Sequence, residues 1–90
     1  MEVHSRTVEV RNKRGLHARA SAKFVNVASA LAAKIEVEKD GNRVVGTSIM
    51  GLMMLGAAMG DSITITCEGE GAEAALAELS ELVETKFGED

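Results

Sequence analysis

The hydrophobic positions along the chain change their period several times, and each change predicts a new element. Strict alternation of polar and apolar residues is typical of a strand that buries one face. Asp40-Gly41 lies between two such segments and is a strong signal for a hairpin, which would make that pair antiparallel. The four alternating segments are residues 7–10, 34–38, 43–45 and 62–67.

Two other segments show the spacing of three and four residues that is typical of amphipathic helices. A third, between them, is too apolar for a solvated loop and is interpreted as a short helix, weakened by Gly51. The last of them has an apolar stripe that includes Leu76, Val83 and Phe87, and its opposite face carries carboxylates that we expect to be solvated. The resulting order, βαββαβα, predicts a two-layer α+β domain with the helices on the dry face of the sheet. The predicted helices cover residues 18–32, 49–55 and 72–87.

Composition narrows the class of protein. A chain of 90 residues is long enough for a single domain, 1–90. Hydrophobic residues make up 46%, but Phe24 and Phe87 are the only aromatic ones, so the core must be aliphatic. The single cysteine, Cys67, cannot form an internal disulfide, and we expect it to be inert core. Without a transmembrane-length apolar run, a signal peptide or a cluster of metal ligands, we expect a cytoplasmic monomer with no metal, cofactor or membrane partner.

The net charge of −4 argues against nucleic-acid binding, but it hides an asymmetry. Residues 1–34 carry seven Lys and Arg against two acids, whereas residues 35–90 carry three against twelve. His17 lies within the basic part of the chain. This part of the molecule therefore suits an anionic ligand or an acidic partner.

His17 is the main candidate for chemistry. It directly precedes a predicted helix, beside the backbone N–H groups that a helix leaves unpaired. Neutral imidazole is a competent nucleophile, and a helix N-terminus binds a phosphate-sized anion. Arg19 can hold phosphate oxygens, and Arg14 and Lys23 add positive charge. These residues fit a histidine that accepts a phosphoryl group and passes it on, although no second catalytic group lies near His17 in the sequence.

Structural interpretations stand beside the functional one. In the structural alternative, His17 only caps the helix and Arg19 is solvated. Ser48 has the position of a helix cap, yet a phosphate there would be tolerated and could regulate docking. We expect His4 to lie in an unfixed, solvated N-terminal segment. The apolar segment of residues 49–55 cannot bury every side chain, so part of it is expected to form a surface for partners.

Two motifs resemble those of a known family. Residues 15–24, Gly-Leu-His-Ala-Arg-Ala-Ser-Ala-Lys-Phe, are similar to the active-site segment of HPr, the phosphocarrier of the bacterial phosphotransferase system. Residues 48–55, Ser-Ile-Met-Gly-Leu-Met-Met-Leu, are similar to its regulatory-serine segment. The resemblance also includes Gly60-Asp61 and the elements that follow, and it covers nearly the whole chain.

The resemblance implies an open-faced β-sandwich, with an antiparallel sheet of order 1-4-2-3 under three helices. It implies that His17 takes a phosphoryl group on Nδ1 from phosphorylated enzyme I and passes it to a histidine of an enzyme IIA. The protein would then be a transfer intermediate and not an enzyme. Arg19 would stabilise the phosphate, and Ser48 would be the target of an HPr kinase/phosphorylase. The docking residues that it implies are Ala22, Lys23, Ile49, Met50, Leu52 and Met53.

One position departs from the family pattern. The family usually has proline after the active-site arginine, where this chain has Ala20. Alanine adds a backbone donor and loosens the first turn of the helix. The change leaves the branch of the system open: we weigh a sugar-transport carrier against a nitrogen-related regulatory carrier, or a docking module that acts through partner binding. A stand-alone ligand-binding domain or small enzyme is a third class, disfavoured because 90 residues leave little room for a deep pocket.

Overall fold

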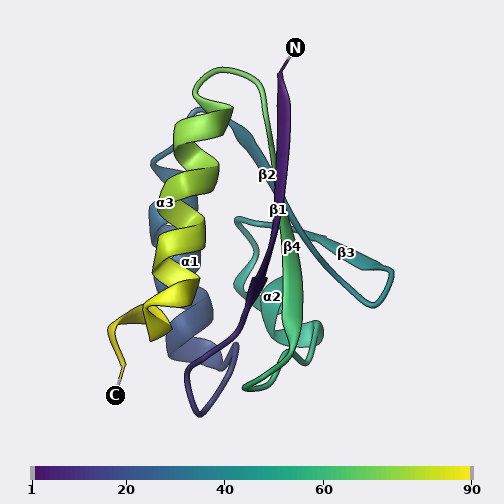
Figure 1. Cartoon of the computed structure of the whole chain (residues 1–90), viewed down its shortest axis with the longest axis vertical. Helices are drawn as coiled ribbons and strands as arrows, with labels where there is room; N and C mark the ends of the chain where they lie inside the picture. The colour runs from purple at the N-terminus through teal and green to yellow at the C-terminus, as the bar shows by residue number, and fades with distance from the viewer. Residues whose placement is uncertain (1, 90) are drawn as a thin grey trace.

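The computed structural model describes residues 2–89 and contains the predicted order of elements (Figure 1). A short 3-10 turn follows the last helix. In chain order the elements are β1 (Val3–Glu9), α1 (Ala18–Ser29), β2 (Lys34–Lys39), β3 (Asn42–Val45), α2 (Ile49–Met54), β4 (Ser62–Glu68), α3 (Ala72–Glu84) and the 3-10 turn η1 (Lys86–Gly88).

The four strands form one antiparallel sheet in the order β1-β4-β2-β3, as the family resemblance implied. β4 lies inside the sheet, where Ile65 is opposite Arg6 of β1 and Val37 of β2. The hairpin predicted at Asp40-Gly41 joins β2 to β3, and both residues have positive φ angles. Two-residue turns with this backbone match the twist of the strands that they connect.

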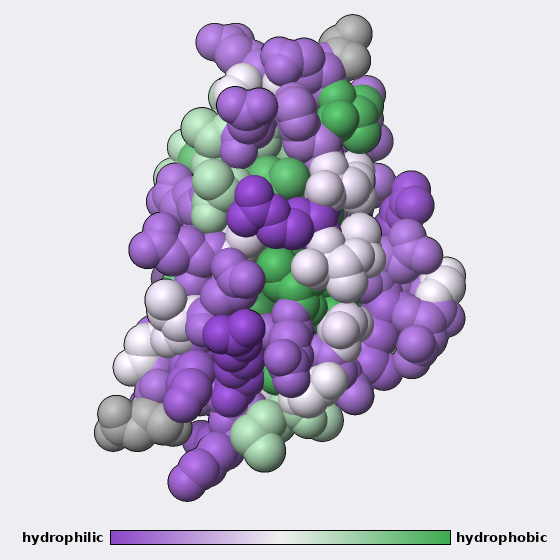
Figure 2. Space-filling model, viewed as in Figure 1, coloured by the Kyte–Doolittle hydropathy of each residue, from purple (hydrophilic) through white to green (hydrophobic). Residues whose placement is uncertain are grey.

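The helices cover one face of the sheet, and the other face stays open (Figure 1). Hydroxyl groups pair across the strands β1 and β4: Ser5 with Thr66 and Thr7 with Thr64, each at 2.9 Å between oxygens. The side on which α3 and β1 face the viewer is mostly hydrophilic, with a few hydrophobic residues visible between these elements (Figure 2). The architecture is therefore an open-faced sandwich, as predicted.

The core lies between the sheet and the helices and is aliphatic apart from two phenylalanines. Phe24 of α1 and Phe87 of η1 are its two largest buried side chains. The alternate residues of β4 predicted to face inward, Ile63, Ile65 and Cys67, are all buried. Within residues 2–89, no helix is long and apolar enough to cross a membrane.

The first strand and the first helix have boundaries that differ from the prediction. β1 begins at Val3, so His4 is part of the sheet, opposite Cys67, and not in an unfixed segment. The strand is longer than predicted because residues 3–6 also pair their backbone groups with β4. The hydropathy pattern does not reveal such pairing. α1 ends at Ser29, because the N–H groups of Ala30 and Leu31 bond to carbonyls only three residues back. This tighter pattern is common where a helix terminates.

The third helix also ends earlier than predicted. The hydroxyl of Thr85 donates to the carbonyl of Glu81 at 2.7 Å, and α3 stops at Glu84. Lys86 and Phe87 then have φ angles of 63° and 55°, a left-handed backbone that reverses the chain. Phe87 is still buried, as its place in the predicted stripe required, but it enters the core from a turn.

The short helix α2 divides its apolar residues between the core and the surface. Leu52 is completely buried, whereas Met50 is 69% and Met54 80% exposed. This corrects the expectation that Leu52 belongs to the docking surface, since on a six-residue helix it occupies the side that packs inward. The prediction that part of this segment is exposed is confirmed.

The loop before α1 packs tightly against the segment that follows α2. The Leu16 N–H donates to the carbonyl of Ala57 at 3.0 Å, and Gly15 has a φ of 64°. A Cβ atom at Gly15 would overlap with the Ala57 carbonyl oxygen and lie 2.9 Å from the Cα atom of Ala58. Glycine is therefore required where these two segments meet.

We expect Leu52→Ala to lower the free energy of unfolding by about 2–5 kcal/mol, because it removes a buried side chain and leaves a cavity. Met54→Ala, its exposed counterpart on the same helix, should change that free energy by less than about 0.5 kcal/mol. Urea unfolding of both variants measures the difference. Equal losses would contradict the assigned orientation of α2.

We expect Gly15→Ala to cost about 3 kcal/mol or more, since it combines a left-handed backbone with an overlap against fixed backbone atoms. Gly41→Ala is the matched control: its φ is 83°, but no heavy atom lies within 4 Å of the added Cβ. The control should lose only about 1 kcal/mol. Thermal or urea unfolding compares them, and a similar cost for both would show that the loop can move away from Ala57.

Candidate functional site

His17 is the N-cap of α1, as the sequence predicted. Its backbone is extended, with φ −74° and ψ 178°, and its Nδ1 accepts the N–H of Arg19 at 3.3 Å. A nitrogen that accepts a hydrogen bond must carry a lone pair. The ring therefore directs an unprotonated Nδ1 towards the positive end of the helix dipole.

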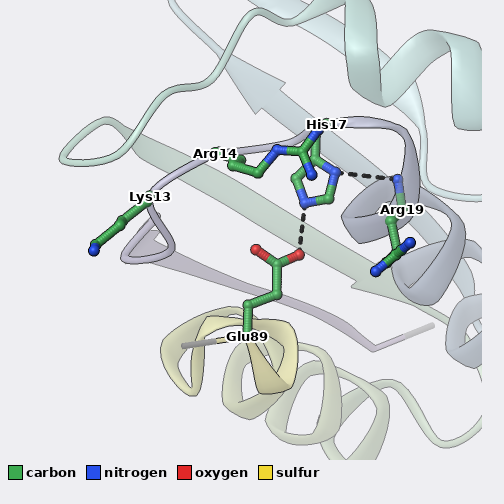
Figure 3. A pocket seen from close by; sticks show the side chains of 5 residues that line it. All are labelled: Lys13, Arg14, His17, Arg19 and Glu89. Carbon is green, nitrogen blue, oxygen red and sulfur yellow. Dashed lines mark hydrogen bonds and ion pairs between the residues drawn. The ribbon is translucent and has the colours of Figure 1, made fainter.

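The other ring nitrogen contacts a residue far away in the sequence. Nε2 of His17 lies 2.6 Å from Oε2 of Glu89, and the two side chains are 14% and 19% exposed (Figure 3). An ionised carboxylate can only accept hydrogen bonds, so Nε2–H is the donor. The contacts at Nδ1 and Nε2 thus specify the same tautomer, with the proton on Nε2 and the lone pair on Nδ1.

Glu89 is held ionised by its neighbours. Desolvation by itself would raise the pKa of this carboxyl group, but hydrogen bonds from His17 and Asn12, together with electrostatic attraction to His17 and Lys23, outweigh it and lower the pKa below the ordinary value. Asn12 is completely buried, and its Nδ2 donates to Glu89 Oε1 at 3.1 Å and to the carbonyl of Gly15 at 2.7 Å. One amide group therefore connects the carboxylate to the loop that leads into His17.

Sequence reasoning missed both Glu89 and Asn12. Glu89 lies 72 residues from His17 and outside the periodic stripe of the last helix. Asn12 stands in a polar loop, where an asparagine is ordinary. The left-handed residues Lys86 and Phe87, which bring Glu89 to the ring, carry no signal in the sequence, since non-glycine residues seldom adopt this backbone.

The ring borders a shallow pocket of about 250 Å³. Figure 3 shows the Glu89 carboxylate directed at the imidazole from the C-terminal segment, whereas Lys13 points away from the ring. With three cationic side chains around one carboxylate, the pocket suits an anion that approaches Nδ1. Its lining consists of Lys13, Arg14, His17, Arg19 and Glu89, so the predicted pair of His17 and Arg19 is brought together.

Ala20 is fully buried in the first turn of α1 and does not line this pocket. The first backbone hydrogen bond of α1 runs from the N–H of Ser21 to the carbonyl of His17 at 2.9 Å, and the Arg19 N–H is used by Nδ1. The N–H of Ala20 belongs to the first turn of α1, whose N–H groups have no acceptor within the helix. The position thus offers a donor that proline would lack.

The remaining predicted site residues lie on α1 and α2, which pack against each other. Ser48 is the N-cap of α2, and its Oγ accepts the N–H of Gly51 at 2.9 Å. Lys23 is exposed, but its Nζ donates to the carbonyl of Phe87 at 2.8 Å and so tethers the C-terminal turn. The other accessible residues are Ala22, which is half-buried, and the exposed Ile49, Met50 and Met53.

Other reactive groups are remote from this site or inert. Burial raises the pKa of the Cys67 thiol, which faces the core from β4 and is fully covered. In the part of the chain that the structure describes, no three metal-ligating side chains come together. His17 and its neighbours therefore form the one cluster in residues 2–89 that combines a nucleophile with an anion-binding environment.

Comparisons with known proteins agree with this geometry. The family model described as "PTS HPr component phosphorylation site" matches residues 4–85. The phosphocarrier protein HPr of Neisseria meningitidis is 46% identical over 83 residues, which cover 92% of this chain and 93% of the relative. The phosphocarrier protein NPr of Shewanella violacea is 40% identical over 84 residues, with 93% and 92% coverage.

A solved structure extends the likeness to the backbone. The crystal structure of an HPr from Thermoanaerobacter tengcongensis superposes with a TM-score of 0.92 at 45% sequence identity, and the match covers 97% of this chain and 98% of that one. The fold, the strand order and the sequence all indicate the same family. The chain therefore belongs to the HPr family, the phosphocarrier proteins of the bacterial phosphotransferase system.

Proposed function

We propose that this chain accepts a phosphoryl group on Nδ1 of His17 from phosphorylated enzyme I, in the cytoplasm, and passes it to a histidine of an enzyme IIA. The observation that carries the proposal is the orientation of the ring: its Nδ1 lone pair faces the N-terminus of α1 in a pocket lined by cations. As a phosphocarrier and not an enzyme, the protein supplies one nucleophile and an anion site.

The transfer requires little from the carrier itself. The Nδ1 lone pair attacks phosphorus, and the bond between phosphorus and the donor atom of enzyme I breaks with its electron pair left on that donor. The Arg19 N–H, whose 3.3 Å bond to Nδ1 is long, is then free to donate to a phosphoryl oxygen. The guanidinium group of Arg19, which lines the pocket, offers further donors to the same group. The reverse sequence delivers the phosphoryl group to the acceptor.

Docking is the second part of the proposed function. The exposed side chains of Ile49, Met50 and Met53 form an apolar patch on α2, and the loop before His17 is bonded to the segment after this helix. A partner seated on the patch would therefore reach the imidazole. Methionine side chains adapt to surfaces of different shape, which suits a carrier that meets both a donor and an acceptor. We propose that Ala22 and Lys23 border this docking patch.

Ser48 supports a regulatory role for the same surface. Its hydroxyl caps α2 directly beside the patch, and a phosphate placed there by an HPr kinase/phosphorylase would keep an acceptor for the Gly51 N–H. The added negative charge would oppose partners that are attracted by the basic part of the chain. Since the protein also resembles an NPr, a nitrogen-related regulatory carrier is the second candidate function.

We expect that incubation with phosphoenolpyruvate and enzyme I adds one acid-labile phosphoryl group to the wild-type protein and none to His17→Ala. The substitution removes Nδ1 of His17, which is the proposed phosphoryl acceptor. The matched control is His4→Ala, because His4 is the other histidine of the chain and lies in β1. Intact-mass spectrometry reads the outcome, and labelling of His17→Ala at the wild-type rate would refute the proposal.

We expect Ser48→Asp to leave the fold intact, because aspartate also caps helices, and to slow association with enzyme I by about tenfold at low salt. The effect should shrink as ionic strength rises, since it is electrostatic. Surface plasmon resonance measures the rate constants. Ser5→Asp adds the same charge on the uncovered face of the sheet and serves as the control. Equal effects of the two variants on the association rate would show that Ser48 is not part of the docking surface.

A further inference from the structure

The C-terminal segment brings a carboxylate to the rear of the candidate nucleophile. Oε2 of Glu89 lies 2.6 Å from Nε2 of His17, and both side chains are mostly buried. The nucleophilic Nδ1 is on the opposite side of the same ring, facing the N–H of Arg19. Glu89 therefore does not occupy the position where a phosphoryl group would bind, but it contacts the ring that would bear it (Figure 3).

Glu89 is held in this place by rigid parts of the fold. Phe87, two residues earlier, is 1% exposed and anchors the turn in the core, while Lys23 Nζ donates to its carbonyl. The buried Asn12 donates to Oε1 of Glu89, which leaves Oε2 for the imidazole. Each carboxylate oxygen thus has its own partner, and the orientation of the group is determined by contacts from α1, η1 and the loop before α1.

We propose that Glu89 is a positioning residue for phosphoryl transfer: it keeps the proton of His17 on Nε2, covers that nitrogen, and directs the reaction to Nδ1. The inference rests on the proposed function of His17 as the phosphoryl acceptor. A carboxylate on the rear nitrogen of a histidine is a general way to orient the ring and select its tautomer. Here the carboxylate comes from the C-terminal end of the chain.

The same contact stabilises the charge that the reaction creates. When Nδ1 bonds to phosphorus, its lone pair is consumed and the ring becomes cationic while the proton remains on Nε2. The Glu89 carboxylate at 2.6 Å compensates this charge without moving. When the phosphoryl group leaves for the next acceptor, the electron pair of the N–P bond returns to Nδ1, and the ring is neutral again. Glu89 accordingly assists both directions of transfer.

Two substitutions separate the effects of charge and coverage. Glu89→Gln keeps the volume of the side chain but removes its charge, so acceptance from phosphorylated enzyme I should slow by about tenfold, the effect of losing one charged hydrogen bond. Glu89→Ala removes the charge and also uncovers Nε2. Glu84→Gln is the control, because Glu84 is an exposed carboxylate at the end of α3.

The deciding experiment uses phosphoramidate, a small phosphoryl donor that needs no partner protein. NMR of the ¹⁵N-labelled full-length chain then locates the phosphoryl group on Nδ1 or Nε2 of His17. We expect Nδ1 alone for the wild type and Glu84→Gln, and a mixture of both positions for Glu89→Ala. Before phosphorylation, an Nε2–H resonance protected from water exchange is expected in the wild type and the control, but not in Glu89→Ala.

The outcomes distinguish this inference from the proposed function. Exclusive Nδ1 phosphorylation of Glu89→Ala, together with wild-type acceptance rates for Glu89→Gln, would overturn the role of Glu89 even if enzyme I labels the protein. If enzyme I fails to label the wild type, the proposed function fails, yet the position of the phosphoramidate-derived group still tests the effect of Glu89 on the ring. Backbone spectra of each variant verify that the core is unchanged.

Discussion

Burial of one face of the sheet beneath α1 and α3 determines where every functional group of this protein lies. The alternate residues of the strands supply an aliphatic surface, and only two aromatic side chains are available to fill the space above it. Phe24 fixes α1, whose first residue follows His17, and Phe87 fixes the turn that carries Glu89. The two sides of the imidazole are thus positioned by the same core, although they come from opposite ends of the chain.

The N-cap position gives His17 a structural task beside the chemical one that we propose for it. A cap side chain normally accepts a firm hydrogen bond from the first turn. Here the bond from the Arg19 N–H to Nδ1 is 3.3 Å long, at the weak end of the usual range, so little is lost when the lone pair is used elsewhere. Ser48 shows the contrast, because its cap bond to the Gly51 N–H is 2.9 Å. The helix therefore depends less on His17 than its position suggests.

Periodicity predicted the order of all seven main elements, since each strand buries one face and each long helix buries one stripe. It also located His17, Arg19 and Ser48, because helix caps have local signals. It could not decide which side of a six-residue helix faces inward, and so it offered no check on the family resemblance, which implied that Leu52 belongs to the docking surface. The turn at Lys86 and Phe87 was not predictable either. It is formed because Phe87 must be buried after Thr85 has ended the helix, and this is a tertiary constraint.

A carrier must take up a phosphoryl group and also release it, so neither state of the histidine can be strongly favoured. In the proposed function, the N–H and guanidinium donors of Arg19 at the start of α1 would stabilise the phosphoryl oxygens and favour the loaded state. A carboxylate at Nε2 acts on the ring instead: it favours the cationic phosphoimidazole, in which the N–P bond has a neutral imidazole as its leaving group. Glu89 would therefore stabilise the loaded ring, as the donors of α1 would stabilise its phosphoryl oxygens, and it would keep a neutral imidazole as the leaving group for the next transfer.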